Sequence, residues 1–274
     1  MKLMVAALVA AFAAIALPAG AQTPRLSNGR IESHATTNIA KDLPALANTL
    51  TEPMWIGYAQ PMIDGERNMC DYWTNGNRYS QSTDPIHLEP ASFFFVLFRI
   101  EEKQITRIRS YSENCPLDAD GKSVHWFTNV SAGDSIAYMK TFMAPNATKK
   151  LNDAAVTVIA MTKGDQALNE LLSLARDGST TAVKGNALFW LAQRAGDKAV
   201  GTITAAIEND PDTEVKKKAV FALSQLPKDE GVPLLIQQAR SNKNPVVRKQ
   251  AMFWLGQSHD PRAVKFFEDI LLKK

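Results

Sequence analysis

The sequence predicts an α+β protein in which a solenoid of about four helical hairpins, residues 151–274, follows a small α+β domain, residues 43–150. Two observations predict this fold class. The C-terminal half repeats itself every 32 residues, and the segment before it is richer in aromatic and β-branched residues. Repeats of about 20 to 50 residues with helical spacing are typical of solenoids, and aromatic and β-branched runs are typical of strands.

The repeat is visible in three aligned segments, VKGNALFWLAQ from Val183, VKKKAVFALSQ from Val215 and VRKQAMFWLGQ from Val247, which begin 32 residues apart. Within each unit, apolar residues recur at helical spacing in two successive stretches separated by turn residues, which predicts a helical hairpin. Moving back another 32 residues places a more divergent first unit at Leu151. Four hairpins exceed the roughly three repeats that a stable stack requires.

These segments resemble a known repeat family. Their pattern Val-Arg/Lys-x-x-Ala-x-x-x-Leu is similar to the HEAT repeats related to those of phycobilisome lyases, although Lys184 and Lys216 stand where Arg is usual and only Arg248 keeps it. The blocks WIGYAQPM, ENCPLDADGKSVHW and AMFWLGQSHDPRAVKFFEDIL also resemble secreted bacterial HEAT-repeat proteins. The resemblance implies an α-solenoid that usually serves protein–protein interaction. It implies no lyase activity, because no cofactor-binding motif of the lyases is visible.

Three segments before the repeats predict strands, at residues 55–60, 93–100 and 104–111. The second is almost uninterrupted hydrophobic sequence, which favours an interior strand with apolar residues on both faces, and Glu101-Glu102-Lys103 is expected to form the hairpin turn that follows it. Ser131 and Asp134 resemble a capping box, which predicts a helix through Met143.

The first residues have the pattern of a secretory signal peptide. Lys2 is followed by an apolar run from Leu3 to Leu17 and by the small residues Ala19-Gly20-Ala21. The run is shorter than the roughly 20 apolar residues of a membrane-spanning helix, so we expect cleavage after residue 21 and no integral membrane segment afterwards. We therefore predict a periplasmic or secreted protein, with a flexible N-terminal segment over residues 22–42.

The two cysteines, Cys70 and Cys115, predict a disulfide in an oxidising compartment. Closing the loop of about 45 residues between these cysteines would stabilise the fold by at most about 4 kcal/mol. Two alternatives remain open. One is a nucleophilic thiol, although neither cysteine has an activating context. The other is a zinc site completed by His87 and His125, although these spacings match no zinc finger.

Composition and motifs favour no catalytic chemistry. The formal charge of +3, from 31 basic and 28 acidic residues, is too nearly balanced to favour nucleic acid as a partner. No P-loop, dinucleotide fingerprint, nucleophile elbow or paired metal-binding histidines occur in the sequence. Asp118, Asp120 and Gly121 resemble the start of a calcium loop, but the later ligands do not follow, so a surface turn is favoured. We expect no enzymatic activity, no metal and no cofactor.

Two features that recur once per repeat are candidate partner-binding surfaces. The first is a basic ladder, and its alternative role is pairing with acidic turn residues of the adjacent repeat, such as Asp210 and Asp212. The second is an apolar stripe beside the main helix face, and its alternative role is packing between neighbouring repeats. The candidate residues are Lys184, Lys216 and Arg248 in the ladder and Phe189, Phe221 and Phe253 in the stripe.

The leading hypothesis for function is an exported, non-enzymatic interaction or scaffold protein that binds a protein partner through its solenoid. This hypothesis rests on the architecture. The alternative is an envelope enzyme or ligand-sensing protein whose site lies in the α+β domain, near Tyr58, Trp73, His87 and His125.

Overall fold

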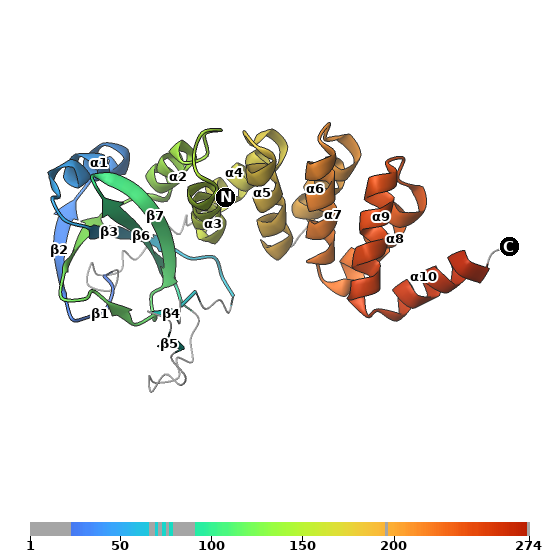
Figure 1. Cartoon of the computed structure of the whole chain (residues 1–274), viewed down its shortest axis with the longest axis horizontal. Coiled ribbons are helices and arrows are strands. Elements are labelled where there is room, and N and C mark those ends of the chain that lie inside the picture. Colours follow the sequence, from blue (N-terminus) through green and yellow to red (C-terminus); the bar gives the residue numbers. More distant parts are fainter. Residues whose placement is uncertain are drawn as a thin grey trace, which may run out of the picture.

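In the computed structural model, a β-sheet near the N-terminal end is followed by a row of stacked helices (Figure 1). The structure describes residues 23–65, 69–70, 73–74, 77–78, 91–194 and 197–272. The predicted signal peptide, residues 1–21, and His87 lie outside these ranges. The predicted fold class, an α+β protein with a C-terminal helical solenoid, is confirmed.

The main sheet has five strands in the order β2-β9-β3-β6-β7. Its strands are β2 (Arg30–Ala35), β3 (Met54–Pro61), β6 (Phe93–Glu101), β7 (Gln104–Ser112) and β9 (Ser123–Thr128). Strand β9 pairs in parallel with both β2 and β3, whereas β6 pairs antiparallel with β3 and β7. The three strands predicted from the sequence are therefore confirmed as β3, β6 and β7, and β6 is interior as expected.

Two short pairs of strands lie outside this sheet. Strand β1 (Leu26–Ser27) pairs in parallel with β8 (Leu117–Asp118), and β4 (Trp73–Thr74) pairs antiparallel with β5 (Asn77–Arg78). The predicted turn after β6 is also present. Glu102 and Lys103 have φ of 51° and 63°, the left-handed backbone that tight hairpin turns require at their two central residues.

The expectation of a flexible segment over residues 22–42 is wrong for the part that the structure describes. Strand β2 occupies the edge of the sheet beside β9, and α1 (Ile39–Thr49) begins directly after Asn38. The Asn38 side chain accepts a hydrogen bond from the Lys41 backbone N–H at 3.2 Å, as an N-cap does. The N-terminal region therefore belongs to the folded body before residue 43.

The remaining helices follow β9 along the chain. They are α2 (Ala132–Thr141), α3 (Lys149–Met161), α4 (Asp165–Asp177), α5 (Thr181–Arg194), α6 (Asp197–Asn209), α7 (Thr213–Ser224), α8 (Lys228–Ser241), α9 (Pro245–Ser258) and α10 (Pro261–Leu272). Ser131 caps α2 by accepting a hydrogen bond from the Asp134 N–H, as the sequence predicts. Among the described residues, no helix is both long enough and apolar enough to cross a lipid bilayer.

Four helical hairpins are confirmed, but their pairing begins one helix earlier than the sequence suggests. Helix α5 packs more closely against α4 than against α6, α7 more closely against α6 than against α8, and α9 more closely against α8 than against α10. Three hairpins are therefore α4–α5, α6–α7 and α8–α9. Helix α3 packs equally against α2 and α4, and in this phase it forms the first hairpin with α2. The stack begins at Ala132 rather than at residue 151, and α10 follows it as an additional helix.

The sheet and the solenoid share one hydrophobic core rather than forming two separate cores. One cluster of buried residues runs from Ile39 in α1 through Phe98 in β6 and Tyr138 in α2 to Phe266 in α10. The rings of Phe98 and Tyr138 are 5.8 Å apart, which joins the sheet to the first hairpin. A boundary between independent domains at residue 150 is therefore not supported by the packing.

Gly57 of β3 lies beneath the side chains of Leu97 and Trp126, which pack on the face of the sheet opposite the shared core. A Cβ at this position would lie 2.5 Å from Leu97 Cδ2, 2.8 Å from Trp126 Cζ3 and 2.9 Å from the Val96 carbonyl oxygen. These distances are shorter than van der Waals contact, so glycine allows Leu97 and Trp126 to pack closely against the central strand.

We expect Gly57→Ala to lower the free energy of unfolding by about 1 to 3 kcal/mol, because the added methyl group overpacks this contact. Urea unfolding followed by tryptophan fluorescence measures the change. The control is Gly201→Ala in α6, where a Cβ meets no atom within 4 Å and alanine favours the helix by up to about 1 kcal/mol. Equal destabilisation by both variants would contradict the packing argument.

Candidate partner-binding surface of the solenoid

The solenoid helices form two layers that differ in packing and in charge. Helices α3, α5, α7 and α9 contact one another in succession, and we call them the close-packed layer. Helices α4, α6, α8 and α10 form the open layer, whose members contact one another less. The close-packed layer contains nine Lys and Arg residues and two Asp and Glu residues, whereas the open layer contains six and nine. The close-packed layer is therefore the positively charged side.

Aromatic side chains of three helices in this layer form a continuous row, which we call the aromatic ladder. Phe189 of α5 stacks on Phe221 of α7, with ring centroids 6.0 Å apart and an interplanar angle of 4°. Phe221 contacts Trp254 of α9 at 4.9 Å. Trp190 and Phe253 complete the row, packing edge-on against Phe189 at 5.3 Å and Trp254 at 5.0 Å. Of the three aligned phenylalanines, Phe189 and Phe221 thus contact each other between repeats, whereas Trp254 rather than Phe253 contacts Phe221.

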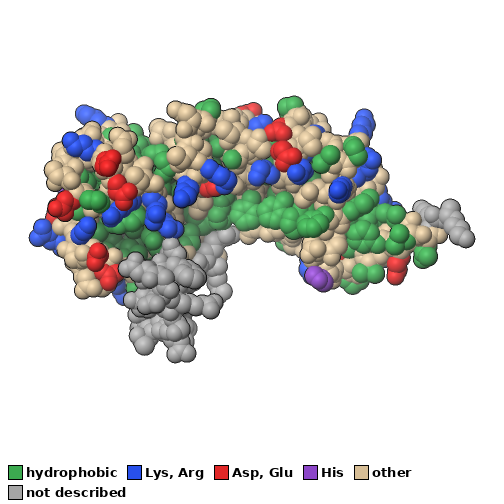
Figure 2. Space-filling view, viewed as in Figure 1, with side chains coloured by type: hydrophobic (Ala, Val, Ile, Leu, Met, Phe, Trp, Pro, Cys, Tyr) green, Lys and Arg blue, Asp and Glu red, His purple; other side chains and the backbone are tan. Residues whose placement is uncertain are grey.

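The aromatic ladder is only partly covered by protein. Phe189 and Phe221 are half-buried, and Phe253 is 53% exposed. In Figure 2, apolar side chains form a band over α5 and α7 and gather again over α9 and α10, with Lys and Arg side chains in a row along one side. Packing between repeats therefore explains part of this stripe and leaves one face of it open.

The basic side chains beside the ladder include Lys217, Lys218 and Lys249, which are all at least partly exposed. Lys217 pairs with Glu214 at 2.9 Å. The stem of Lys218 crosses Gly185 of the preceding repeat so closely that a Cβ on Gly185 would lie 2.1 Å from Lys218 Cδ. One turn after each ladder phenylalanine the chain carries a glutamine, at positions 193, 225 and 257. Amide groups thus follow the aromatic row on α5 and α9 and directly after α7.

The residues of the predicted basic ladder, Lys184, Lys216 and Arg248, are bonded within the solenoid. Lys184 Nζ donates to Asp210 Oδ2 at 2.7 Å, and the two side chains are only 19% and 7% exposed. This is the pairing with an acidic turn residue that the sequence left as the alternative. Because a buried ion pair breaks at a large cost, Lys184 is held in the scaffold.

Lys216 and Arg248 each bind backbone carbonyl groups at the end of the preceding helix, within their own hairpins α6–α7 and α8–α9. Lys216 Nζ donates to the carbonyl oxygens of Ile207 and Glu208 at 2.7 Å each, in the last turn of α6. Arg248 Nη1 donates to the carbonyl oxygens of Asn242 and Lys243, just after α8, at 2.8 and 3.2 Å. Cations at these positions satisfy carbonyl groups that a helix end leaves without a partner.

A second set of bonds fixes the register between successive repeats. Asp212 caps α7 by accepting from the Glu214 N–H at 2.8 Å, and its other oxygen accepts from the Thr181 hydroxyl of the preceding repeat at 2.6 Å. The bond from Thr181 is the main cause that lowers the pKa of Asp212. One repeat later, Asn244 donates to Thr213 at 3.4 Å. These bonds position the helices whose side chains form the aromatic ladder.

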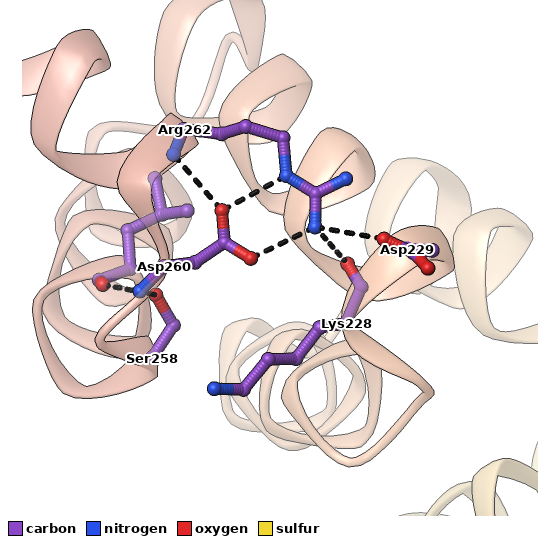
Figure 3. A network of polar contacts seen from close by, with 6 residues as sticks. Lys228, Asp229, Ser258, Asp260 and Arg262 are labelled. Carbon is purple, nitrogen blue, oxygen red and sulfur yellow. Dashed lines mark hydrogen bonds and ion pairs between the residues drawn. The ribbon is translucent and has the colours of Figure 1, made fainter.

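The turn into α10 is held by the contacts drawn in Figure 3. Arg262 Nε and Nη2 donate to the two carboxylate oxygens of Asp260 at 2.8 Å each, and Nη2 also donates to the Lys228 carbonyl oxygen at 3.1 Å. These bonds from Arg262 hold the pKa of Asp260 at about 2. His259, with φ of 51°, ends α9 in the left-handed conformation. Helix α10 is thereby anchored to the start of α8.

The structure joins Cys70 and Cys115 in the predicted disulfide, with Cα atoms 5.3 Å apart. A zinc site using these two thiolates is therefore excluded, since both sulfur atoms are bonded to each other. At the suggested calcium loop, Asp118 Oδ1 accepts from the Asp120 N–H at 2.8 Å, and Asp120 and Gly121 have positive φ. This is the surface turn that the sequence favoured.

The alternative hypothesis placed a site in the α+β domain, and two of its residues, Tyr58 and His125, contact different neighbours. Tyr58 is fully buried, its hydroxyl lies 2.8 Å from Ser135 Oγ, and burial raises its pKa. His125 is nearly buried, and its Nδ1 lies 3.0 Å from His34 Nε2. Burial is the main cause that lowers the pKa of His125. The Trp73 side chain and His87 lie outside the described residues.

Trp190 and Trp254 were missed as candidate site residues. Both stand in the aligned segments, one position after a ladder phenylalanine. Because helical spacing places Trp190 on the main apolar face, the sequence alone assigned it to the core. A tryptophan large enough to reach from the core face to the surface was the available signal.

Comparison with known proteins agrees with this architecture. Residues 168–252 and 200–274 match the family model described as HEAT repeats. The helices over residues 168–274 are therefore similar to HEAT repeats, and the predicted resemblance is confirmed at the level of the repeat. No curated protein matches the sequence.

Two solved structures are similar to about half of this chain. The complex of CpcE and CpcF of phycocyanin lyase from Nostoc sp. has 15% sequence identity and a TM-score of 0.38, over 52% of this chain and 89% of that chain. YibA of E. coli has 21% sequence identity and a TM-score of 0.36, over 52% of this chain and 55% of that chain.

Proposed function

We propose that this chain is an exported, non-enzymatic protein whose HEAT-repeat solenoid binds a protein partner through the aromatic ladder. One observation carries the proposal. Aromatic rings from three successive helices form a single stripe that is only partly covered, on the layer with nine basic and two acidic residues. Aromatic groups surrounded by polar residues are the usual energetic centre of protein interfaces.

Repeat packing alone does not account for the exposure of the ladder. Phe221 is sandwiched between Phe189 and Trp254, whereas Phe253 touches Trp254 and leaves 53% of its surface in water. Fully burying a Phe side chain contributes about 1.5 to 3 kcal/mol, so covering the open part of the ladder would favour association. The hydrophobic contribution to partner binding would centre on Phe253.

The basic residues that face a partner differ from those predicted. Because Lys184, Lys216 and Arg248 are bonded within the scaffold and Lys217 is paired with Glu214, we assign the electrostatic part of binding to Lys218 and Lys249. Charges on the rim of an interface mainly raise the association rate and select the partner by sign. The partner is therefore a protein with a net acidic binding surface.

Export is supported by the signal-peptide pattern at residues 1–21 and by the disulfide between Cys70 and Cys115. A disulfide persists in an oxidising compartment, so the two features agree. We propose that the working protein begins at Gln22 in the periplasm or the medium. Cell fractionation with sequencing of the N-terminus of the purified protein tests this part of the proposal.

Site-specific photo-crosslinking tests the binding surface. Benzoylphenylalanine is incorporated in place of Phe253 in the close-packed layer and, as the matched control, in place of Gln237, which is exposed on α8 in the open layer. Illumination of the cells that produce the protein should give discrete protein adducts from position 253 and none of the same adducts from position 237.

Two results would overturn the proposed surface. One is the absence of any reproducible adduct at position 253 when the variant is present at the normal level and remains folded. The other is an identical set of adducts from both positions, which would show collision rather than docking on the aromatic ladder.

A further inference from the structure

Two histidines face each other across the edge of the main sheet. His34 lies on the edge strand β2 and His125 on its neighbour β9, and His34 Nε2 is 3.0 Å from His125 Nδ1. Glu32 of β2 stands opposite His125 in the strand register, and its Oε2 is 3.6 Å from the same Nδ1. A hydrogen bond between two imidazole rings needs a hydrogen on one nitrogen and a lone pair on the other. The contact therefore holds only while at least one of the two rings is neutral.

A positive charge on His125 meets a second obstacle. Its side chain is 8% exposed, and its other ring nitrogen, Nε2, is buried with no hydrogen-bond partner among the described residues. A protonated imidazole carries a hydrogen on both nitrogens, so a charged His125 would leave a buried N–H without an acceptor, which is costly. Burial is the main cause that lowers the pKa of His125, while Glu32 acts in the opposite direction. The folded sheet therefore favours the neutral ring.

The acidic group beside the pair balances one extra proton. The Glu32 carboxylate is shared, because its Oε1 lies 3.3 Å from Arg30 Nε. A hydrogen bond with Ser123 is the main cause that lowers the pKa of Glu32, so its charge is constant over the range in which histidines titrate. Glu32 therefore favours a first proton on the His34–His125 pair and leaves a second proton without a counter-charge.

The other elements around His125 do not supply that counter-charge. Strand β3 places Ile56 beside it, and α1 packs its apolar residues into the same core. The charged residues of α1 are Lys41, which is exposed, and Asp42, which accepts from the Thr36 hydroxyl at 2.6 Å. The charged groups among the described residues that act on His125 therefore belong to β2.

Strand β2 has less apolar surface to hold it than the interior strands have. It lies at the edge of the sheet and pairs with β9 over six residues (Figure 1). Ile31 is its single large apolar residue, whereas the interior strand β6 is apolar over most of its length. Segments with little buried apolar surface open locally at a lower free-energy cost than the whole protein unfolds. Loss of the contact between His34 and His125 therefore loosens β2 before the rest of the sheet.

We infer that His34 and His125 form an acid-sensitive latch that holds β2 on the sheet at neutral pH and releases it in acid. In the released form both rings are in water and each takes up a proton, whereas the latched form holds at most one. Because the pKa of His125 is lower in the latched form, that form is favoured above the ordinary histidine pKa of 6.5 and loses stability as the pH falls below it. Release leaves the backbone of β9 with an unpaired edge, a surface to which another strand can add.

Native-state amide hydrogen exchange of the purified protein, read by mass spectrometry between pH 8 and pH 5, tests the latch. Rates are corrected for the intrinsic pH dependence of exchange. Residues 30–35 report on β2, and residues 93–101 of β6 are the internal reference. An opening that takes up one proton becomes up to about tenfold more populated per pH unit. We therefore expect exchange of β2 to accelerate by up to about tenfold per unit below pH 6.5 while β6 stays protected.

Two variants remove a titrating ring and keep a hydrogen-bonding group near the contact. His34→Gln places an amide near the position of Nε2, and His125→Asn places one near the position of Nδ1. Each variant should lose most of the acid acceleration of β2. Thermal unfolding at pH 8 reports whether each variant is folded, and His34→Gln carries the test if the buried substitution does not fold, since His34 is only partly buried.

His259→Asn is the matched control. His259 ends α9 with φ of 51°, a conformation that asparagine adopts more readily than most residues, and it lies in the solenoid rather than in the sheet. This variant also removes a histidine, so the total number of titrating rings falls by the same amount. It should keep the full acid response of β2.

Three outcomes would overturn the latch. The first is a corrected exchange rate of β2 that does not change between pH 8 and pH 5. The second is equal acid acceleration in the unmodified protein and in His34→Gln, which would show that another group titrates. The third is acceleration of β2 and β6 together, which would show unfolding of the whole sheet rather than release of one strand. None of these results bears on the aromatic ladder, so the latch and the proposed function stand or fall separately.

Discussion

Removal of the Cys70–Cys115 disulfide is expected to lower the free energy of unfolding by up to about 4 kcal/mol, the loop-entropy value for cysteines 45 residues apart. The bond ties residues 69–70 to the end of β7, where Cys115 is 2% exposed and the Met69 N–H donates to Ser112 Oγ at 3.0 Å. Domains of ordinary stability unfold with about 5 to 15 kcal/mol, so the loss is a large share of the total. Urea unfolding of the Cys70→Ser/Cys115→Ser variant measures it.

The same variant supplies the control for this prediction. A reducing agent should shift the unfolding midpoint of the unmodified protein toward that of the double variant and should leave the double variant unchanged. Thiol titration of the denatured, unreduced protein should find no free cysteine, because both cysteines of the chain are in the bond. Equal midpoints for the two proteins before reduction would contradict a stabilising disulfide.

The strands that could be predicted are those whose own residues reveal their burial. In β6, Phe94, Val96 and Phe98 face the shared core while Phe95 and Leu97 face the opposite side of the sheet, so the apolar run itself predicts an interior strand. Strand β2, with the sequence RIESHA, lies at an edge and keeps few large apolar residues. Its partner β9 is about 90 residues away in the chain, and no local pattern shows a pairing of that kind.

For a related reason, the repeat pattern could not show which neighbouring helices pair to form each hairpin. Helix α5 buries Val183, Ala187, Leu188 and Leu191, enough apolar surface to pack against helices on both sides. Helical periodicity shows that such a helix is buried without showing which neighbour lies closer. The observed choice of α4 over α6 depends on inter-helix geometry, which a single sequence does not contain.

The candidate site was predicted in part. Alignment of the repeats placed Phe189 and Phe221 together, as they are in the structure, because residues at equal positions in a solenoid stack on one another. At the third repeat the ring that contacts Phe221 is Trp254, and Phe253 packs beside it. The same alignment found Lys216 and Arg248 but not their role, since their acceptors are backbone carbonyl oxygens at helix ends. Every residue carries a carbonyl group, so sequence comparison cannot show which ones need a cation.

Phe253→Ala is expected to weaken the binding of 12-residue peptides, selected from a random displayed library on the purified protein, by about 30-fold or more, in line with the roughly 2 kcal/mol that defines a hot-spot residue. Phe253 is the most exposed ring of the ladder, and its removal deletes apolar contact area while leaving the stack of Phe189, Phe221 and Trp254 in place. The stability of the free protein should therefore change much less than the affinity. Isothermal titration and thermal unfolding measure the two quantities.

Leu271→Ala is the matched control, because Leu271 is an exposed apolar residue, at 81%, on α10 and outside the ladder. If apolar exposure in general attracted the peptides, the two truncations would weaken binding alike. If Phe253 serves only to pack α9, its truncation would lower the unfolding temperature and leave affinity unchanged. Selective loss of affinity in Phe253→Ala is the outcome that a docking surface requires, since only a group covered in the complex and open in the free protein contributes to the difference between them.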